Sequence, residues 1–129
     1  MFFVFNNFNP YIAIIGDIKK SKSIEERKVF QNKLNKVLSE INERYSDSIA
    51  SNFTITLGDE FQGLLHSGKN IMDIIQYIKR GSYPVKIRFG IGVGAITTEI
   101  NSKISIGADG PGYYKARDSI ENLKILEKK

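Results

Sequence analysis

The order of strand-like and helix-like segments is the feature of this sequence that most restricts its fold. The segment YIAIIG, Tyr11 to Gly16, is apolar almost throughout, which is typical of a central strand buried on both faces. Apolar residues then recur at helical spacing from Ile24 to Tyr45 and predict an amphipathic helix. Two more strands are predicted. The first is the alternating segment ASNFTITL over residues 50–57, and the second, over residues 61–65, runs back along it after a short turn.

The second half of the chain adds a helix, a strand, a hairpin and a last helix. Isoleucines between Ile71 and Ile78 mark a helix that Gly81 is expected to end. In VKIRFGIGVGAI, residues 85–96, apolar side chains alternate with basic residues and glycines, which predicts a strand. The segment TTEINSKISI, residues 97–106, is typical of a minor hairpin, and a last helix is expected to begin near Pro111.

Together these segments predict an α+β chain with the order β-α-β-β-α-β. This is the ferredoxin-like split βαβ pattern, here with an added hairpin and a C-terminal helix. Two right-handed crossovers would place the first strand beside the third, and the two would run antiparallel. The first strand ends at Asp17 and the third begins near Asp59, so the topology predicts that both carboxylates lie at one edge of the sheet.

Composition limits the kinds of protein that the chain can be. The 129 residues fit a single domain, predicted over residues 11–126, after an apolar N-terminal extension over residues 1–10. The absence of cysteine excludes disulfides and thiolate metal sites. No apolar run reaches the roughly 20 residues that span a bilayer, and no signal peptide is evident, so we expect a cytoplasmic protein without a membrane partner. The net charge of +5 is compatible with an anionic partner.

The predicted pair of carboxylates, Asp17 and Asp59, suggests a metal site. Two carboxylates repel one another unless a cation lies between them. Mg²⁺ meets this need, because it takes one or two carboxylates and completes its shell with water and phosphate oxygens. Gly58 would let a polyphosphate approach the backbone, and Lys19 and Lys20 would offset its charge. The same residues also fit a plain alternative, a Gly-Asp turn beside a solvated lysine loop.

Four sequence blocks carry a resemblance to a known family. They are AIIGDIKKSK, FTITLGDEFQGLL, RFGIGVGAITT and GADGPGYYKAR, and they follow one another between Tyr11 and Leu123. In this order they are similar to the SatD family. Longer members of that family carry a further C-terminal region that resembles a helix-turn-helix. The resemblance therefore leaves open a regulatory or DNA-associated module without catalytic activity.

A more distant similarity connects the chain with nucleotide cyclases. GDI at residues 16–18 resembles a strand end of class III cyclases, and GDEF at residues 58–61 matches all but the first residue of the GGDEF signature of diguanylate cyclases. The resemblance implies a nucleotide-cyclase-like palm. In such a palm Asp17, Asp59 and the carbonyl of Ile18 hold two metal ions, Mg²⁺ or Mn²⁺, on a nucleoside triphosphate.

Several residues differ from their counterparts in these families. Leu57 stands where a GGDEF domain has a further glycine, and Ile55 stands where adenylyl cyclases have a purine-reading lysine. In the last helix Arg117 matches the arginine of an N-x-x-x-R pattern, but Tyr113 replaces the asparagine. The similarity thus implies a domain that binds a nucleoside triphosphate or another nucleotide. It leaves open whether the domain is a nucleotidyl cyclase or a degenerate sensor without turnover.

The cyclase resemblance also implies a full site and an assembly. Cyclases of this type are dimers in which the helix arginine of one protomer faces the metal site of the other, so we expect a homodimer with Arg117 acting across it as a catalytic residue beside Asp17 and Asp59. The residues that the resemblance places beside the phosphates and the nucleotide are Ile18, Lys19, Lys20, Gly58, Glu60 and Tyr113.

Two further features are weaker guides. Gly90, Gly92 and Gly94 alternate along a strand, which favours a smooth sheet face against which another element packs closely. GADGPG before the last helix fits either an anion-binding helix N-terminus or a helix cap at Asp109. Nucleic acid ranks below a nucleotide as a partner, because glutamates dilute the lysines of the first helix and the strands lack the aromatic pattern of RNA-binding sheets.

Overall fold

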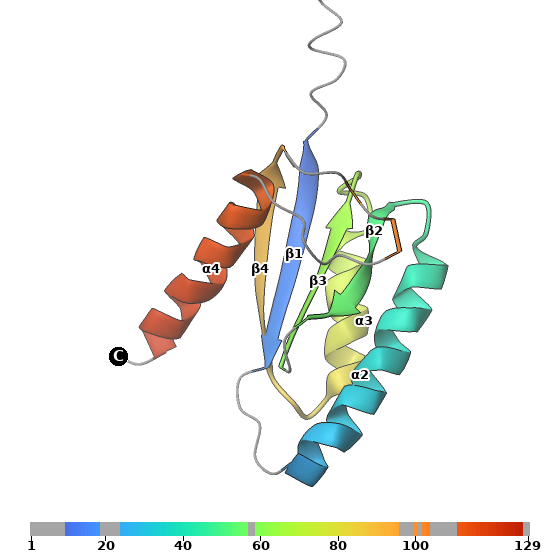
Figure 1. Ribbon diagram of the computed structural model, residues 1–129, viewed down its shortest axis with the longest axis vertical. Helices are drawn as coiled ribbons and strands as arrows, with labels where there is room; N and C mark the ends of the chain where they lie inside the picture. The colour runs from blue at the N-terminus through green and yellow to red at the C-terminus, as the bar shows by residue number, and fades with distance from the viewer. Residues whose placement is uncertain are drawn as a thin grey trace, which may run out of the picture.

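The computed structural model describes residues 10–18, 24–56, 59–95, 100, 102–103 and 111–127. Within these ranges the chain forms a four-stranded antiparallel sheet flanked by helices (Figure 1). The elements are, in chain order, β1 (Tyr11–Ile18), α2 (Ile24–Arg44), β2 (Ile49–Ile55), β3 (Glu60–Leu65), α3 (Ile71–Ser82), β4 (Ile87–Gly94) and α4 (Pro111–Glu127). No helix within these ranges is long and apolar enough to cross a bilayer.

The order of the strands confirms the predicted fold. It is β2-β3-β1-β4, so β1 lies between β3 and β4 and is antiparallel to both. In this register Asp17 is opposite Glu60 on one side and opposite Arg88 on the other. Charged ends of three strands therefore meet at one edge of the sheet.

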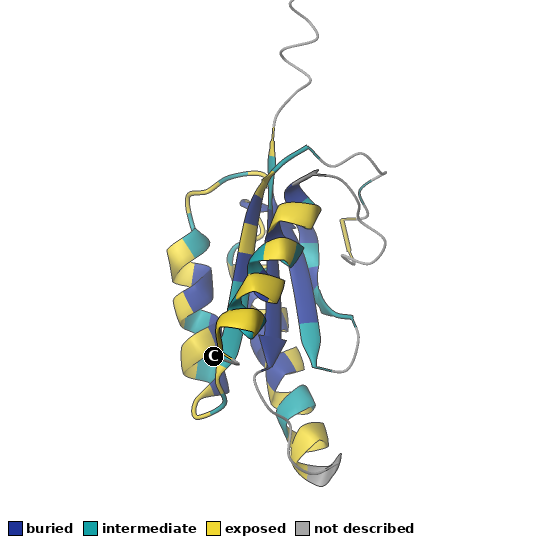
Figure 2. Cartoon of the chain, turned by 90° about the vertical axis from the view of Figure 1, so that its left-hand side faces the viewer, coloured by how far each residue is buried: buried dark blue, intermediate teal, exposed yellow. Residues whose placement is uncertain are grey.

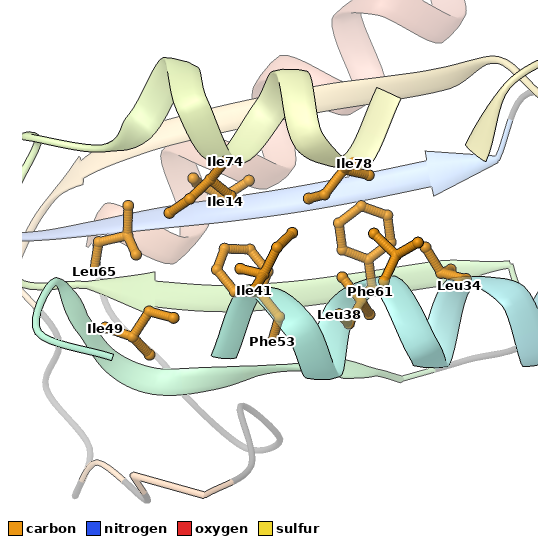
Figure 3. Packing of buried hydrophobic residues seen from close by; sticks show 11 residues of the cluster. Ile14, Leu34, Leu38, Ile41, Ile49, Phe53, Phe61, Leu65, Ile74 and Ile78 are labelled. Atoms are coloured by element: carbon orange, nitrogen blue, oxygen red, sulfur yellow. The ribbon is translucent and has the colours of Figure 1, made fainter. Parts of the chain in front are cut away.

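Helices cover both faces of the sheet (Figure 1). On one face α2 and α3 enclose the larger core, in which Ile14, Ile41, Phe61 and Ile74 are fully buried (Figure 3). On the other face α4 covers a smaller core. That core consists of Ala13, Ile15, Leu64, Ala116 and Ile120. Because the central strand β1 is buried from both sides, the sheet does not offer the open platform with which RNA-binding sheets stack bases.

The glycines of β4 let α4 pack unusually close to the sheet. A Cβ atom on Gly92 would lie 2.1 Å from the carbonyl oxygen of Gly112 and 2.4 Å from the amide nitrogen of Ala116. A Cβ atom on Gly90 would lie 2.2 Å from the carbonyl oxygen of Ala116. The backbone of α4 therefore rests directly on the backbone of β4, as the alternating glycines predict.

Several element ends differ from the expectation by one or two residues. Gly81 does not end the second helix, which continues to Ser82. Gly81 instead lets Val37 of α2 approach, since a Cβ atom there would lie 2.5 Å from a methyl carbon of Val37. The fourth strand begins at Ile87 and not at Val85. The expected hairpin over residues 97–106 lies largely outside the described residues, as does Asp109.

Candidate functional site

The candidate site lies where β1 ends and β3 begins. The amide nitrogen of Ile18 donates a hydrogen bond to the carbonyl oxygen of Asp59 at 2.9 Å, one position beyond the cross-strand pair of Asp17 and Glu60. The structure thus brings together the backbones of four residues that the sequence assigns to the site. Three others lie outside the described residues, namely Lys19, Lys20 and Gly58.

Asp17 faces the α4 layer and is surrounded by positive charge. Its side chain is 10% exposed, and its oxygen Oδ2 lies 2.9 Å from a guanidinium nitrogen of Arg88 and 3.4 Å from Nζ of Lys124. Arg88 in turn bonds Glu127, with Nε donating to Oε1 at 2.9 Å. The carboxylate of Asp17 is therefore neutralised by one side chain from β4 and one from α4.

Asp59 lies in the turn just before β3, and its carboxylate is on the α2 side of the sheet, opposite to the side that Asp17 faces. Among the described residues, the cation that pairs with its carboxylate is on α2, where Nε of Arg27 lies 3.9 Å from Oδ1. This distance is too long for a hydrogen bond. Oδ1 is nevertheless shielded from solvent, and it accepts no hydrogen bond from the described residues. Asp59 thus presents one shielded oxygen without a hydrogen bond from the described residues, on a carboxylate that is 35% exposed as a whole and has only a distant ion-pair partner in Arg27.

Arg117 and Tyr113 join Glu60 on the α4 side. Arg117 donates two hydrogen bonds to the carboxylate of Glu60, at 2.9 and 2.5 Å, and a third to the hydroxyl oxygen of Tyr113 at 3.1 Å. The side chain of Glu60 is 15% exposed. All three residues were expected near the nucleotide, and the structure places them together within a single chain.

Both arginines of the site are held firmly in their charged form. Hydrogen bonding to Glu127 is the main cause that raises the pKa of Arg88, and burial opposes it. Hydrogen bonding to Glu60 likewise raises the pKa of Arg117, against the opposing effect of burial. An arginine whose pKa is higher in the folded state than in the unfolded state stabilises the fold. This contribution is complete below the unfolded pKa and is lost only as the pH rises through the folded pKa. Both guanidinium groups therefore remain positive at any physiological pH.

An open groove lies next to this edge, between α2 and the connection from α3 to β4. It has a volume of about 430 Å³ and is lined mainly by apolar and aromatic side chains. The hydroxyl of Ser82, which also lines the groove, is buried and has no hydrogen-bond partner among the described residues. Glu26, next to Arg27, forms part of the rim. The remaining lining residues are Val29, Phe30, Lys33, Tyr83, Pro84 and Val85.

The donor set fits a magnesium-type ion only in part. No three His, Cys, Asp or Glu side chains in the described part of the chain are grouped to hold a metal ion. Mg²⁺ needs only one or two protein carboxylates when phosphates supply other ligands, so this does not exclude a metal-nucleotide site. The shielded oxygen Oδ1 of Asp59 fits such an ion. Asp17 fits it only if the ion displaces a cation that now neutralises it.

Sequence reasoning missed the basic residues that lie beside the two aspartates. Arg88 was predicted to share a strand face with the glycines, but its pairing with Asp17 depends on the register between β1 and β4. Lys124 and Glu127 reach the site because α4 crosses β4 and β1, and Arg27 reaches it from α2. The spacing of basic residues along these helices gives no signal of such contacts.

Comparison with known proteins agrees with the fold. A crystal structure of the catalytic core of a rhodopsin-guanylyl cyclase with converted specificity, in complex with ATPαS, matches this chain with a TM-score of 0.60. The two are 15% identical in sequence, and the match covers 86% of this chain and 71% of that chain. Such a likeness shows a cyclase-like fold. No curated protein matches the chain. The model of the SatD family matches residues 11–128.

Proposed function

The chain belongs to the SatD family, and we propose that its cyclase-like domain binds a nucleoside triphosphate together with Mg²⁺ or Mn²⁺ at the edge formed by β1 and β3. The observation that carries this proposal is the buried oxygen Oδ1 of Asp59, which accepts no hydrogen bond from the described residues. An anionic oxygen that is shielded from water and accepts no hydrogen bond costs the fold free energy, although less than a fully buried carboxylate would, because the side chain of Asp59 is 35% exposed. A bound cation would remove that cost, and the structural neighbour solved with ATPαS makes a nucleotide the natural source of the remaining ligands.

Asp59 is the carboxylate that would hold the metal ion, with the main-chain carbonyl of Ile18 beside it as the cyclase resemblance implies. Asp17, the third group of that resemblance, faces the α4 side of the sheet and would join only by leaving Arg88 and Lys124. The ion would supply a positive centre that neutralises phosphate oxygens and polarises the phosphorus. Lys19, Lys20 and Gly58 would contact the phosphates, as the sequence predicts.

The groove beside α2 offers a place for the base. Its side chains Phe30 and Tyr83 present aromatic surface, and a planar base stacks favourably on such surface. The hydroxyl of Ser82, which has no hydrogen-bond partner among the described residues, would donate a hydrogen bond to a base nitrogen or oxygen. A volume of about 430 Å³ lies within the range of small-molecule sites.

Binding is better supported than turnover. Cyclase chemistry uses two metal ions held by both aspartates. In this chain Arg88 and Lys124 both form ion pairs with the oxygen Oδ2 of Asp17. A second ion would have to compete with two positive charges that are already in place. We therefore propose a nucleotide-binding domain in which turnover, if any, is slow.

A thermal-shift experiment tests the proposal. Wild type is melted with Mg²⁺ or Mn²⁺ and each common nucleoside triphosphate, and with inorganic tripolyphosphate as a probe that lacks a base. A ligand at 100 times its dissociation constant adds roughly 2.7 kcal/mol, which corresponds to a rise in Tm of several degrees. Asp59→Asn should abolish the rise, whereas Asp47→Asn, which alters an exposed carboxylate in the turn after α2, should not. No shift of wild type with any nucleotide would refute the proposed function.

A further inference from the structure

One face of the edge strand β4 is left partly open to solvent. Within the described residues β4 pairs only with β1, and its register places Ile91 opposite Ile14. Val93 is likewise opposite Ile12. Cross-strand partners share a face of a sheet, and Ile14 belongs to the core under α2 and α3, so Ile91 and Val93 face that side. They are nevertheless 37% and 48% exposed, and they alternate with buried glycines along the strand (Figure 2).

An open cavity lies beside Val93, at the end of the sheet where β1 begins. It has a volume of about 520 Å³, which is within the range of binding sites for small groups. Pro10, Ile12 and Val93 give it an apolar wall, and His66 and Ser67 lie on its polar side. None of the described residues that line it is Asp, Glu, Lys or Arg. This cavity, which we call the β1 cavity, therefore suits an uncharged and largely apolar occupant.

The sequence that precedes Pro10 has the composition that this lining accepts. Residues 1–9, MFFVFNNFN, lie outside the described residues and contain no Asp, Glu, Lys or Arg. Large apolar side chains of this kind gain free energy when they leave water. The apolar members of the segment are Met1, Phe2, Phe3, Val4, Phe5 and Phe8.

The segment is joined to the chain at the cavity itself, because Pro10 is one of the lining residues. Phe8 precedes Pro10 by two positions, so their Cα atoms are at most about 7 Å apart. The pair Asn9-Pro10 favours a turn, which would direct the segment back toward the sheet. So short a tether gives an effective concentration in the millimolar range, which favours the segment of the same chain over that of a second copy.

We propose that the β1 cavity and the exposed face of β4 are the docking surface for residues 1–9 of the same chain. Phe8 enters the cavity between Ile12 and Val93, and the apolar residues before it cover Ile91. The asparagine amides of the segment remain on the polar side of the cavity, where they can hydrogen-bond. The inference does not depend on nucleotide binding, because β1 begins at this cavity and reaches the candidate site only at its other end.

Engineered cysteines test the docking, because the chain has no cysteine of its own. In the full chain, Asn7→Cys is combined either with His66→Cys, at an exposed position of the cavity, or with Tyr114→Cys. Tyr114 is the matched control, since it is also exposed and lies in the first turns of α4, on the other face of the same end of the sheet. We expect an intramolecular disulfide that forms at least about tenfold faster in the His66→Cys pair, the ratio that burial of one phenylalanine side chain gives.

A further substitution separates docking from the nearness that any tether produces. Phe8→Ser, added to Asn7→Cys and His66→Cys, should slow disulfide formation to the rate of the Tyr114→Cys pair. Asn6→Ser, the control in the same segment, should leave the rate unchanged. In the chain without cysteines, Phe8→Ser should increase amide hydrogen exchange over residues 91–94 by about tenfold, because the cover of β4 is lost.

Two results would overturn the inference. Equal rates for the two cysteine pairs, or a rate that Phe8→Ser does not change, would mean that the segment does not occupy the β1 cavity. A disulfide that joins two chains, seen as a dimer on a non-reducing gel of dilute protein, would assign the surface to the segment of a second copy and refute docking within one chain.

Discussion

Arg117 forms a two-point ion pair with Glu60 of its own chain. One guanidinium nitrogen donates to Oε2 at 2.9 Å and the other to Oε1 at 2.5 Å. The two residues are 57 positions apart in the sequence, so the pair fastens the first half of α4 to the start of β3. This arginine therefore has a structural partner within the chain, whatever it does toward a nucleotide.

Breaking this ion pair should destabilise the fold. We expect Arg117→Met to lower the free energy of unfolding by about 1.5 kcal/mol, the low end for hydrogen bonds to charged groups, because the pair is partly exposed. Urea denaturation of Arg117→Met, Glu60→Gln and the double variant forms a double-mutant cycle. A coupling energy near zero would show that the pair contributes nothing. Arg80→Met, at an exposed position of α3, is the control.

The homodimer remains a prediction, and Arg117 provides its test. To act on the nucleotide of a partner protomer, this arginine would have to exchange Glu60 for a phosphate oxygen. For such a composite site, mixing Asp59→Asn with Arg117→Ala chains should recover part of the nucleotide binding that each lacks alone. If neither variant is rescued by the other, and both sediment as monomers with metal and nucleotide present, Arg117 belongs to the internal ion pair only.

The contribution of Arg88 to stability should not depend on pH near neutrality. Its hydrogen bond with Glu127 raises its pKa above the ordinary value, so its contribution is complete below the unfolded pKa and falls only as the pH rises through the folded one. The difference in unfolding free energy between wild type and Arg88→Met should thus stay constant from about pH 7 to about pH 9, far below any arginine pKa. A change in this difference, measured by urea denaturation, would mean that another group in contact with Arg88 titrates in that range.

A side chain at Gly92 should push α4 away from β4. The added Cβ atom of Gly92→Ala would meet backbone atoms of Gly112 and Ala116 at 2.1 and 2.4 Å, and backbone cannot move aside as a flexible side chain can. We expect a loss of roughly 3 kcal/mol or more, at the upper end of overpacking costs. Gly68→Ala is the matched control, because its nearest contacts are ordinary at 3.5 Å. Equal stability of the two variants would contradict the close contact.

Periodicity was sufficient to predict most of the fold. The strands and helices follow from alternation and helical spacing, and the crossover rule places β1 beside β3. The prediction that Gly81 ends the helix was wrong. This glycine is present because a side chain there would collide with Val37 of α2. The chain leaves the helix two residues later, at Tyr83, which precedes a proline.

The sequence was sufficient to predict that the backbones of Asp17 and Asp59 meet at one end of the sheet, but not that their side chains face opposite sides of it. Strand order brings Asp17 and the neighbours of Asp59 together, and that order can be derived from the sequence. The cations come from α2, β4 and α4, and their arrival depends on register and on the angle at which each helix crosses the sheet. The spacing of residues along one helix or strand gives neither the register between strands nor the crossing angle of a helix. The ion pairs of Asp17 could therefore not be predicted from the sequence.

The contact of Gly90 and Gly92 with the backbone of α4 also works as a pivot. From Ala116 to Glu127 the helix extends about 16 Å past this pivot, at 1.5 Å per residue. A tilt of about 4° at the glycines would displace Glu127 by about 1 Å over a lever arm of that length. Small rotations at Gly90 and Gly92 would thus produce larger displacements at the C-terminal end of α4. Because these two residues have no side chain, they determine how close α4 lies to the sheet.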